Sequence, residues 1–170
     1  MPPDDAATLR DQVLAWFDAY KDSLYRYLRT LLYNPADIDD VIQTTFLALL
    51  EKGTALRHIH HPKTYIYRVA RFKAIDLLRH YSHAAVSLEG LLVEPAHEVM
   101  PQRILAEHVN WALAQLTPLA RETVVLKVCD KLTFREVAQV TGCLLPTAAT
   151  RYMRAIHKLR TLLEECHENK

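Results

Sequence analysis

The residues with the clearest binding chemistry lie in one stretch, PKTYIYRVARFKAIDLLRHY, which runs from Pro62 to Tyr81. Arginine and lysine alternate there with tyrosine and phenylalanine at helical spacing. The cations can bind phosphate, and the flat rings can stack on unpaired bases. The aromatic candidates are Tyr65, Tyr67, Phe72 and Tyr81. This pattern predicts that the segment binds a single-stranded nucleic acid.

The distribution of charge agrees with that prediction better than the net charge does. The whole chain carries a net charge of only +1. However, residues 57–83 hold six basic residues and one acid, and residues 145–161 hold four basic residues and no acid. Because a nucleic acid meets a local surface, two basic segments in acidic surroundings favour nucleic-acid binding.

The elements that position these residues are expected to be helices. Apolar residues recur at spacings of three and four, and the 170 residues include only three glycines. No run alternates as a half-buried strand would. We therefore predict an all-α fold of two small helical domains, residues 1–81 and 102–170. The flexible linker between them, residues 82–101, contains Gly90, Pro95 and Pro101 and has no clear periodicity.

Three helical segments are expected in the first domain. The first covers about residues 8–33, with a break near residues 21–23. The second begins with Asn34 as N-cap and ends at Gly53, and the third begins at Pro62.

The second of these segments is expected to be amphipathic. Leu50 belongs to its inward apolar set. The outward set is Asp39, Asp40, Gln43 and Leu47. An acidic face with an exposed leucine predicts a protein partner.

The second domain is predicted to contain a helix-turn-helix. Thr133 and Glu136 form a capping box, Gly142 supplies the turn, and Pro146 marks the start of a basic last helix. The outward side of that helix would carry Thr147, Thr150, Arg151, Arg154 and Lys158. An arginine in the major groove can donate two hydrogen bonds to guanine, while threonine and lysine mainly bind phosphate.

These residues also have simpler interpretations. The basic side of the last helix could be an ordinary solvated face, and Tyr65 or Phe72 could belong to the core. A metal site at His58, His60 and His61 lacks a nearby HExxH or CxxC partner set, which favours solvated or phosphate-facing histidines.

The cysteines and the lack of an apolar leader indicate where the protein works. The three cysteines are an odd number without a CxxC pair, and no apolar run is long enough to span a membrane. We therefore expect a reducing, cytoplasmic compartment and no direct membrane insertion.

Taken together, the chain resembles the sigma-70 superfamily of RNA polymerase specificity subunits, in its short extracytoplasmic-function (ECF) branch. In the first domain, the family's order and spacing are followed by LYRYLRTLL (24–32), DIDDVIQTTFLALL (37–50) and HPKTYIYRVARFKAIDLLRH (61–80). In the second domain, LTPLARETVVLKVCDKLTFREVAQVTG (116–142) and the helix after it follow the same pattern. The sequence departs from the family pattern at Thr44, His61, Phe72, Leu144, Pro146 and Ala149.

The resemblance implies an alternative sigma factor that binds core RNA polymerase and directs promoter recognition, DNA melting and transcription initiation. Asp39, Asp40, Gln43 and Leu47 would bind the clamp helices of the largest polymerase subunit. Lys63, Tyr65, Arg68, Arg71, Phe72, Lys73 and Arg79 would engage the minus-ten element, where a non-template base is flipped out. Thr147, Thr150, Arg151, Arg154 and Lys158 would read the minus-thirty-five duplex, in a domain that also touches the polymerase flap.

Such a protein catalyses no reaction and needs no metal or cofactor, and the family also includes members held by an anti-sigma factor. Two other functions stay open at this point. One is a helix-turn-helix regulator that acts without core polymerase. The other is a small metal-dependent enzyme in which one of the clustered histidines acts with Asp37, Asp39 or Asp40.

Overall fold

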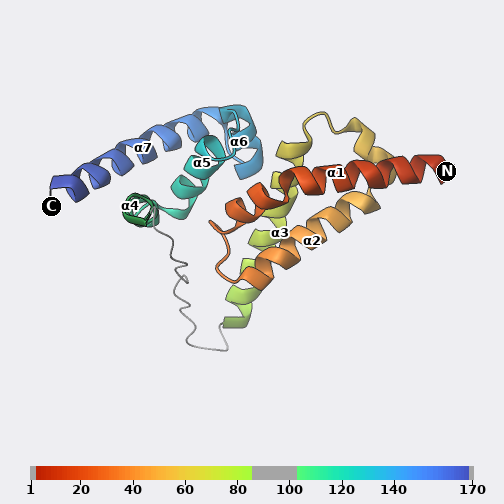
Figure 1. Ribbon diagram of the computed structural model, residues 1–170, viewed down its shortest axis with the longest axis horizontal. Helices are drawn as coiled ribbons and strands as arrows, with labels where there is room; N and C mark the ends of the chain where they lie inside the picture. Colours follow the sequence, from red (N-terminus) through yellow and green to blue (C-terminus); the bar gives the residue numbers. More distant parts are fainter. Residues whose placement is uncertain (1–2, 86–102, 169–170) are drawn as a thin grey trace. The chain divides into compact units, whose positions relative to one another are not determined.

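The computed structural model describes residues 3–85 and 103–168, and every regular element in these ranges is a helix. The chain divides into two compact units, Met1–Leu91 and Leu92–Lys170. The first unit contains α1 (Pro3–Leu28), α2 (Pro35–Glu51), the 3-10 helix η1 (Gly53–His58) and α3 (Pro62–Ala85). The second contains α4 (Arg103–Ala114), α5 (Pro118–Val128), α6 (Phe134–Thr141) and α7 (Leu145–Glu168), as Figure 1 shows. The expected all-α fold is confirmed.

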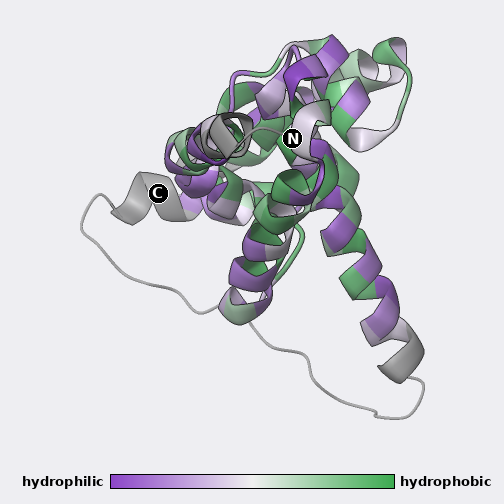
Figure 2. Cartoon of the chain, turned by 90° about the vertical axis from the view of Figure 1, so that its right-hand side faces the viewer, coloured by the Kyte–Doolittle hydropathy of each residue, from purple (hydrophilic) through white to green (hydrophobic). Residues whose placement is uncertain are grey.

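The first unit forms because its helices bury apolar side chains against one another, and hydrophobic and hydrophilic residues are interspersed along the helices of the chain (Figure 2). α1 packs against α2 and α3, and η1 closes onto α1 and α2. Fully buried side chains from three helices, including Leu24, Leu49 and Ile66, fill the centre. Aromatic pairs reinforce this core, because Phe17 of α1 meets Phe46 of α2 edge to face at 5.1 Å between ring centroids.

The structure contradicts expectations for α1 and for Tyr67 in the first unit. α1 runs without a break through residues 21–23. The Ser23 hydroxyl donates to the carbonyl of Tyr20, and the Nζ of Lys21 lies 3.9 Å from a carboxylate oxygen of Asp18. Polar side chains in this stretch therefore find partners within the helix. Tyr67 is not available for base stacking, because it is completely buried and its ring stacks on that of Tyr27 with 5.1 Å between the centroids.

The linker and its boundaries are only partly within the described residues. α3 continues to Ala85, so residues 82–85 are helical. The remainder of the expected linker, together with residue 102, lies outside the described residues. The division into residues 1–81, 82–101 and 102–170 stays a prediction.

The second unit contains the expected helix-turn-helix. The Thr133 hydroxyl accepts a hydrogen bond from the backbone N–H of Glu136, whose carboxylate accepts one from the N–H of Thr133, so the capping box begins α6. Gly142 ends α6 in the left-handed region with φ of 68°. α7 then packs against α4, α5 and α6. Its buried side presents Ala148 and Ala155, as expected.

Candidate nucleic-acid interface

One exposed face of α3 carries aromatic and basic side chains together. With about 100° of rotation per residue, Tyr65, Arg68, Phe72 and Arg79 lie within about 60° of one another around the helix. Phe72 is 68% exposed, both arginines are exposed, and Tyr65 is half-buried. We call these four residues the α3 face. It offers a flat apolar ring between cations, the combination that an unpaired strand requires.

Tyr65 is held at the edge of the α3 face by two cations. The Nζ of Lys52 and the Cζ of Arg68 each lie 5.6 Å from the centroid of its ring. Cation–π contacts of this kind contribute about 0.5–1 kcal/mol each at exposed sites. Phe72 has no such contact in the described chain, so it is the more accessible aromatic ring on this face.

The other predicted minus-ten residues lie away from the α3 face. Lys63, Arg71 and Lys73 are half-buried and point to other sides of the helix. The Nζ of Lys63 lies 5.7 Å from the ring centroid of the buried Tyr67. The structure therefore brings four of the seven predicted residues onto one surface and separates the remaining three from it.

α2 presents the expected acidic surface and one residue more. Asp39, Asp40, Gln43 and Leu47 are all exposed. Leu50, which was expected inside, is 41% exposed. It lies about 100° around the helix from the buried Leu49, on the side of Gln43 and Leu47. These residues form what we call the α2 face, in which two leucines lie beside two carboxylates.

A hydrogen bond connects the two helices that carry these faces. The hydroxyl of Tyr81, in the last turns of α3, donates to the carboxylate of Asp37 in the first turn of α2 at 2.9 Å. This bond raises the pKa of the Tyr81 phenol, and the charges of Asp37 and Asp40 add to the effect. The contact joins residues that are 44 positions apart in the sequence.

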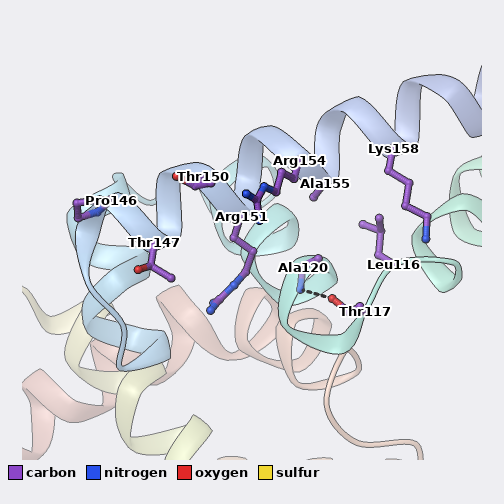
Figure 3. Close-up of a pocket in the computed structure, with 10 residues that line it drawn as sticks. All are labelled: Leu116, Thr117, Ala120, Pro146, Thr147, Thr150, Arg151, Arg154, Ala155 and Lys158. Carbon is purple, nitrogen blue, oxygen red and sulfur yellow. Dashed lines mark hydrogen bonds between the residues drawn. The ribbon is translucent and has the colours of Figure 1, made fainter.

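In the second unit, a groove of about 500 Å³ runs between α7 and the start of α5. Figure 3 shows Arg151 and Lys158 reaching from α7 to the α5 side, with Thr117 and Ala120 opposite. All five predicted minus-thirty-five residues line this groove. Thr147, Arg151 and Lys158 share one side of α7, whereas Thr150 and Arg154 are rotated farther from the core. No hydrogen bond or ion pair within the described residues engages the guanidinium groups of Arg151 and Arg154.

The wall of the groove is held by cations that satisfy the carbonyl groups at the end of α4. The guanidinium of Arg121 donates to the carbonyls of Leu113 and Ala114 at 2.9 and 3.0 Å. Lys158 donates to the carbonyl of Gln115 at 2.8 Å. The sequence gives no signal for Arg121, because its partners are backbone groups of another helix. Lys158 lies on the exposed side of α7, but its ammonium group already has a partner.

His58, His60 and His61 are exposed, and no group of three or more histidine, cysteine or acidic residues in the described part of the chain could hold a metal ion. Cys129 and Cys143 are free thiols, and the side chain of Cys166 lies outside the described residues. No described helix has both the length and the apolar character needed to cross a bilayer.

Comparisons with known proteins match both units. The family model for sigma-70 region 2 matches residues 16–83, and that for sigma-70 region 4 matches residues 112–159. The chain is 30% identical to the RNA polymerase sigma factor CarQ of Myxococcus xanthus over 162 residues, covering 87% of this chain and 91% of CarQ. It is 26% identical to the ECF RNA polymerase sigma factor SigW of Bacillus subtilis, covering 87% of each chain.

The fold also has a counterpart among solved structures. The sigma factor RpoE of Bartonella quintana, crystallised in complex with the anti-sigma factor NepR, superposes with a TM-score of 0.74. The match covers 91% of this chain and 96% of that one, at 19% identity. At this identity the likeness concerns the fold alone.

Proposed function

Because the chain belongs to the sigma-70 family, in its ECF branch, we propose that it binds core RNA polymerase, recognises promoters and melts their DNA to start transcription. It would act by binding alone, in the cytoplasm where core polymerase works. The observation that carries the proposal is the pairing of the α3 face, suited to an unpaired strand, with a helix-turn-helix suited to a duplex.

The α2 face is proposed to bind the clamp helices of the largest polymerase subunit. Asp39 and Asp40 supply negative charge for basic side chains, and Leu47 and Leu50 supply apolar area beside them. Charge complementarity of this kind favours the right partner and speeds association, while the leucines contribute burial. Gln43 lies between these groups on the same side of the helix.

The α3 face is proposed to capture the non-template strand of the minus-ten element. Unstacking a base costs a few kcal/mol, and stacking it on an aromatic ring returns about 1–3 kcal/mol. Phe72 is the ring best placed to receive it, since Tyr65 is already flanked by cations. Arg68 and Arg79 would hold the strand's phosphates, while Lys63, Arg71 and Lys73 add positive charge around the face.

α7 is proposed to read the minus-thirty-five duplex. Thr147, Thr150, Arg151 and Arg154 would contact it. The guanidinium groups of both arginines have no hydrogen bond or ion pair among the described residues, which suits them to base edges or phosphates. We propose that Lys158 mainly supports the wall of the groove, because it is bound to Gln115. The polymerase flap is a further proposed partner of this unit.

An anti-sigma factor is also a proposed partner. Two structural relatives have solved structures in complexes: RpoE of Bartonella quintana with the anti-sigma factor NepR, and CnrH with the cytosolic domain of CnrY. By analogy, we propose that a protein inhibitor occupies surfaces of this chain that core polymerase would use.

The test is co-purification with core polymerase, followed by transcription from promoters selected by the resulting holoenzyme. Asp39→Lys combined with Asp40→Lys should weaken core binding by about tenfold or more, because it reverses the charge of the α2 face. The matched control, Asp11→Lys with Asp22→Lys, makes the same charge change at exposed sites on α1 and should have less than about a twofold effect.

Two results would contradict the proposal. One is equal core binding by the α2 double variant and the α1 control. The other is tight, sequence-specific duplex binding by the chain alone that core polymerase does not improve, which would identify a regulator that acts without polymerase.

A further inference from the structure

One side of α7 combines exposed apolar residues with the residues proposed to read DNA. Met153 is 65% exposed, although it lies in a helix whose other flank is basic. Pro146 lies about 20° from it around the helix, and Ala149 about 40°. None of these three side chains carries a strong hydrogen-bond donor or acceptor. Between residues 146 and 153 this side of α7 is therefore apolar, with Pro146 and Met153 exposed and Ala149 half-buried; His157 and Arg160 lie on the same side farther along the helix.

Exposure alone decides nothing, because single exposed apolar residues are common on protein surfaces. The position of Met153 is what matters. Ala148 and Ala155 are buried, so the side of α7 that can enter a major groove is the opposite one, where Thr150 lies. Met153 and Arg154 flank Thr150 there, about 60° away on one side and 40° on the other.

The neighbouring contacts keep Met153 on that outer side. Tyr152 is turned to the core, where its ring meets Phe134 at 5.4 Å between centroids. Thr147 and Arg151 are turned to the groove beside α5 (Figure 3). A duplex that meets Thr150 must therefore meet Met153 and Arg154, whereas Arg151 is better placed for the phosphates at one edge.

The chemistry of methionine restricts what it can read. The thioether is only a weak acceptor, so Met153 cannot distinguish the donors and acceptors of base edges. The apolar group on a base edge in the major groove is the C5-methyl of thymine. A flexible, polarisable side chain packs well against such a group. We propose that Met153 determines specificity by contacting a thymine methyl in the minus-thirty-five element; this rests on the proposed function of α7 as the duplex reader.

The experiment uses holoenzyme assembled from the full chain and core polymerase. A duplex library randomised upstream of the minus-ten element first gives the preferred sequence. Each thymine of that sequence is then replaced singly by uracil, which removes only the methyl. At one position the replacement should weaken binding about fourfold, the value of one buried methyl group.

The same replacements are then measured with variants. Met153→Ala should abolish the effect of uracil at that one position, and Met153→Leu, which keeps an apolar side chain, should retain it. Val128→Ala is the control, because it truncates an exposed apolar residue outside α7 and should leave the uracil response unchanged. Thermal melts check that all variants are folded.

Three outcomes are informative. Loss of the uracil response only in Met153→Ala supports the assignment. A uracil response of equal size in the wild type and Met153→Ala, or no response at any thymine, overturns the role of Met153 and leaves the proposed function standing. Failure of the holoenzyme to select any upstream sequence overturns the proposed function together with it.

Discussion

Replacing Lys158 by alanine distinguishes two possible roles of this residue, which are to stabilise the end of α4 and to bind DNA. Its ammonium group donates to the carbonyl of Gln115, just beyond the end of α4. A cation at a helix C-terminus contributes about 0.3–1 kcal/mol, so we expect Lys158→Ala to lower the free energy of unfolding by about 0.5 kcal/mol. In a domain of this size that loss corresponds to a decrease in Tm of about 2–4 °C.

The effect on DNA binding should be small for Lys158 and large for Arg151. Each phosphate contact contributes about 0.9 to the slope of log affinity against log salt, or about eightfold between 1 M and 0.1 M salt. Arg151 lines the groove and has no hydrogen bond or ion pair in the described chain, so Arg151→Ala should reduce the slope by about 0.9. Lys158→Ala should reduce it by less than about 0.3, because the ammonium group stays on Gln115.

The assay is binding of the holoenzyme to a labelled promoter duplex over a series of salt concentrations, with thermal melts of the same variants. Lys158→Gln serves as a control, because it keeps a donor for the carbonyl of Gln115 and loses the charge. It should recover part of the lost stability and bind DNA as Lys158→Ala does. If Lys158→Ala lowers the salt slope as much as Arg151→Ala, Lys158 leaves Gln115 on binding and the reasoning is refuted.

Three further predictions concern the α3 helix and the turn. Tyr67→Ala should lower the free energy of unfolding by about 3–5 kcal/mol because its ring is fully buried. Phe72→Ala should change that free energy by less than about 0.5 kcal/mol and should instead reduce promoter opening. Urea melts measure the stability and permanganate reactivity measures the opening, and the reverse pattern would contradict the packing. Gly142→Ala should lower the free energy of unfolding, measured in urea melts, by about 1 kcal/mol. The loss comes from the φ of +68° alone, since no atom lies within 4 Å of an added Cβ. An unchanged free energy of unfolding would mean that the turn adopts another conformation. The bond to Asp37 raises the folded pKa of Tyr81, so its stabilising effect is present below about pH 10 and disappears as pH rises through the raised pKa. Wild type and Tyr81→Phe should therefore differ in unfolding free energy at pH 8 and converge at high pH, and a constant difference would argue against the bond.

Local signals in the sequence predicted the second unit well. The capping box at Thr133 and Glu136 and the turn at Gly142 depend on residues within a few positions of one another, so the sequence contains all the information they need. The outward set on α7 followed from helical periodicity for the same reason.

Long-range packing accounts for what the sequence did not predict. Tyr67 is an aromatic residue between basic ones, so the sequence suggests that it binds a base. Only the fold places Tyr27 against it. Leu50 lies at the edge of the apolar stripe of α2, where periodicity alone does not decide burial. Arg121 acts through carbonyl groups on α4, which no pattern of side chains indicates.

The bond between Tyr81 and Asp37 has a thermodynamic consequence for the first unit. It joins the first turn of α2 to the last turns of α3. The making and breaking of this one bond therefore affects both helices at that end. A ligand that draws Asp37 away must also release the phenol of Tyr81. Suppose that a second ligand binds α3 and that its affinity depends on the position of Tyr81. By thermodynamic linkage, each of the two ligands then changes the affinity of the other by the same factor.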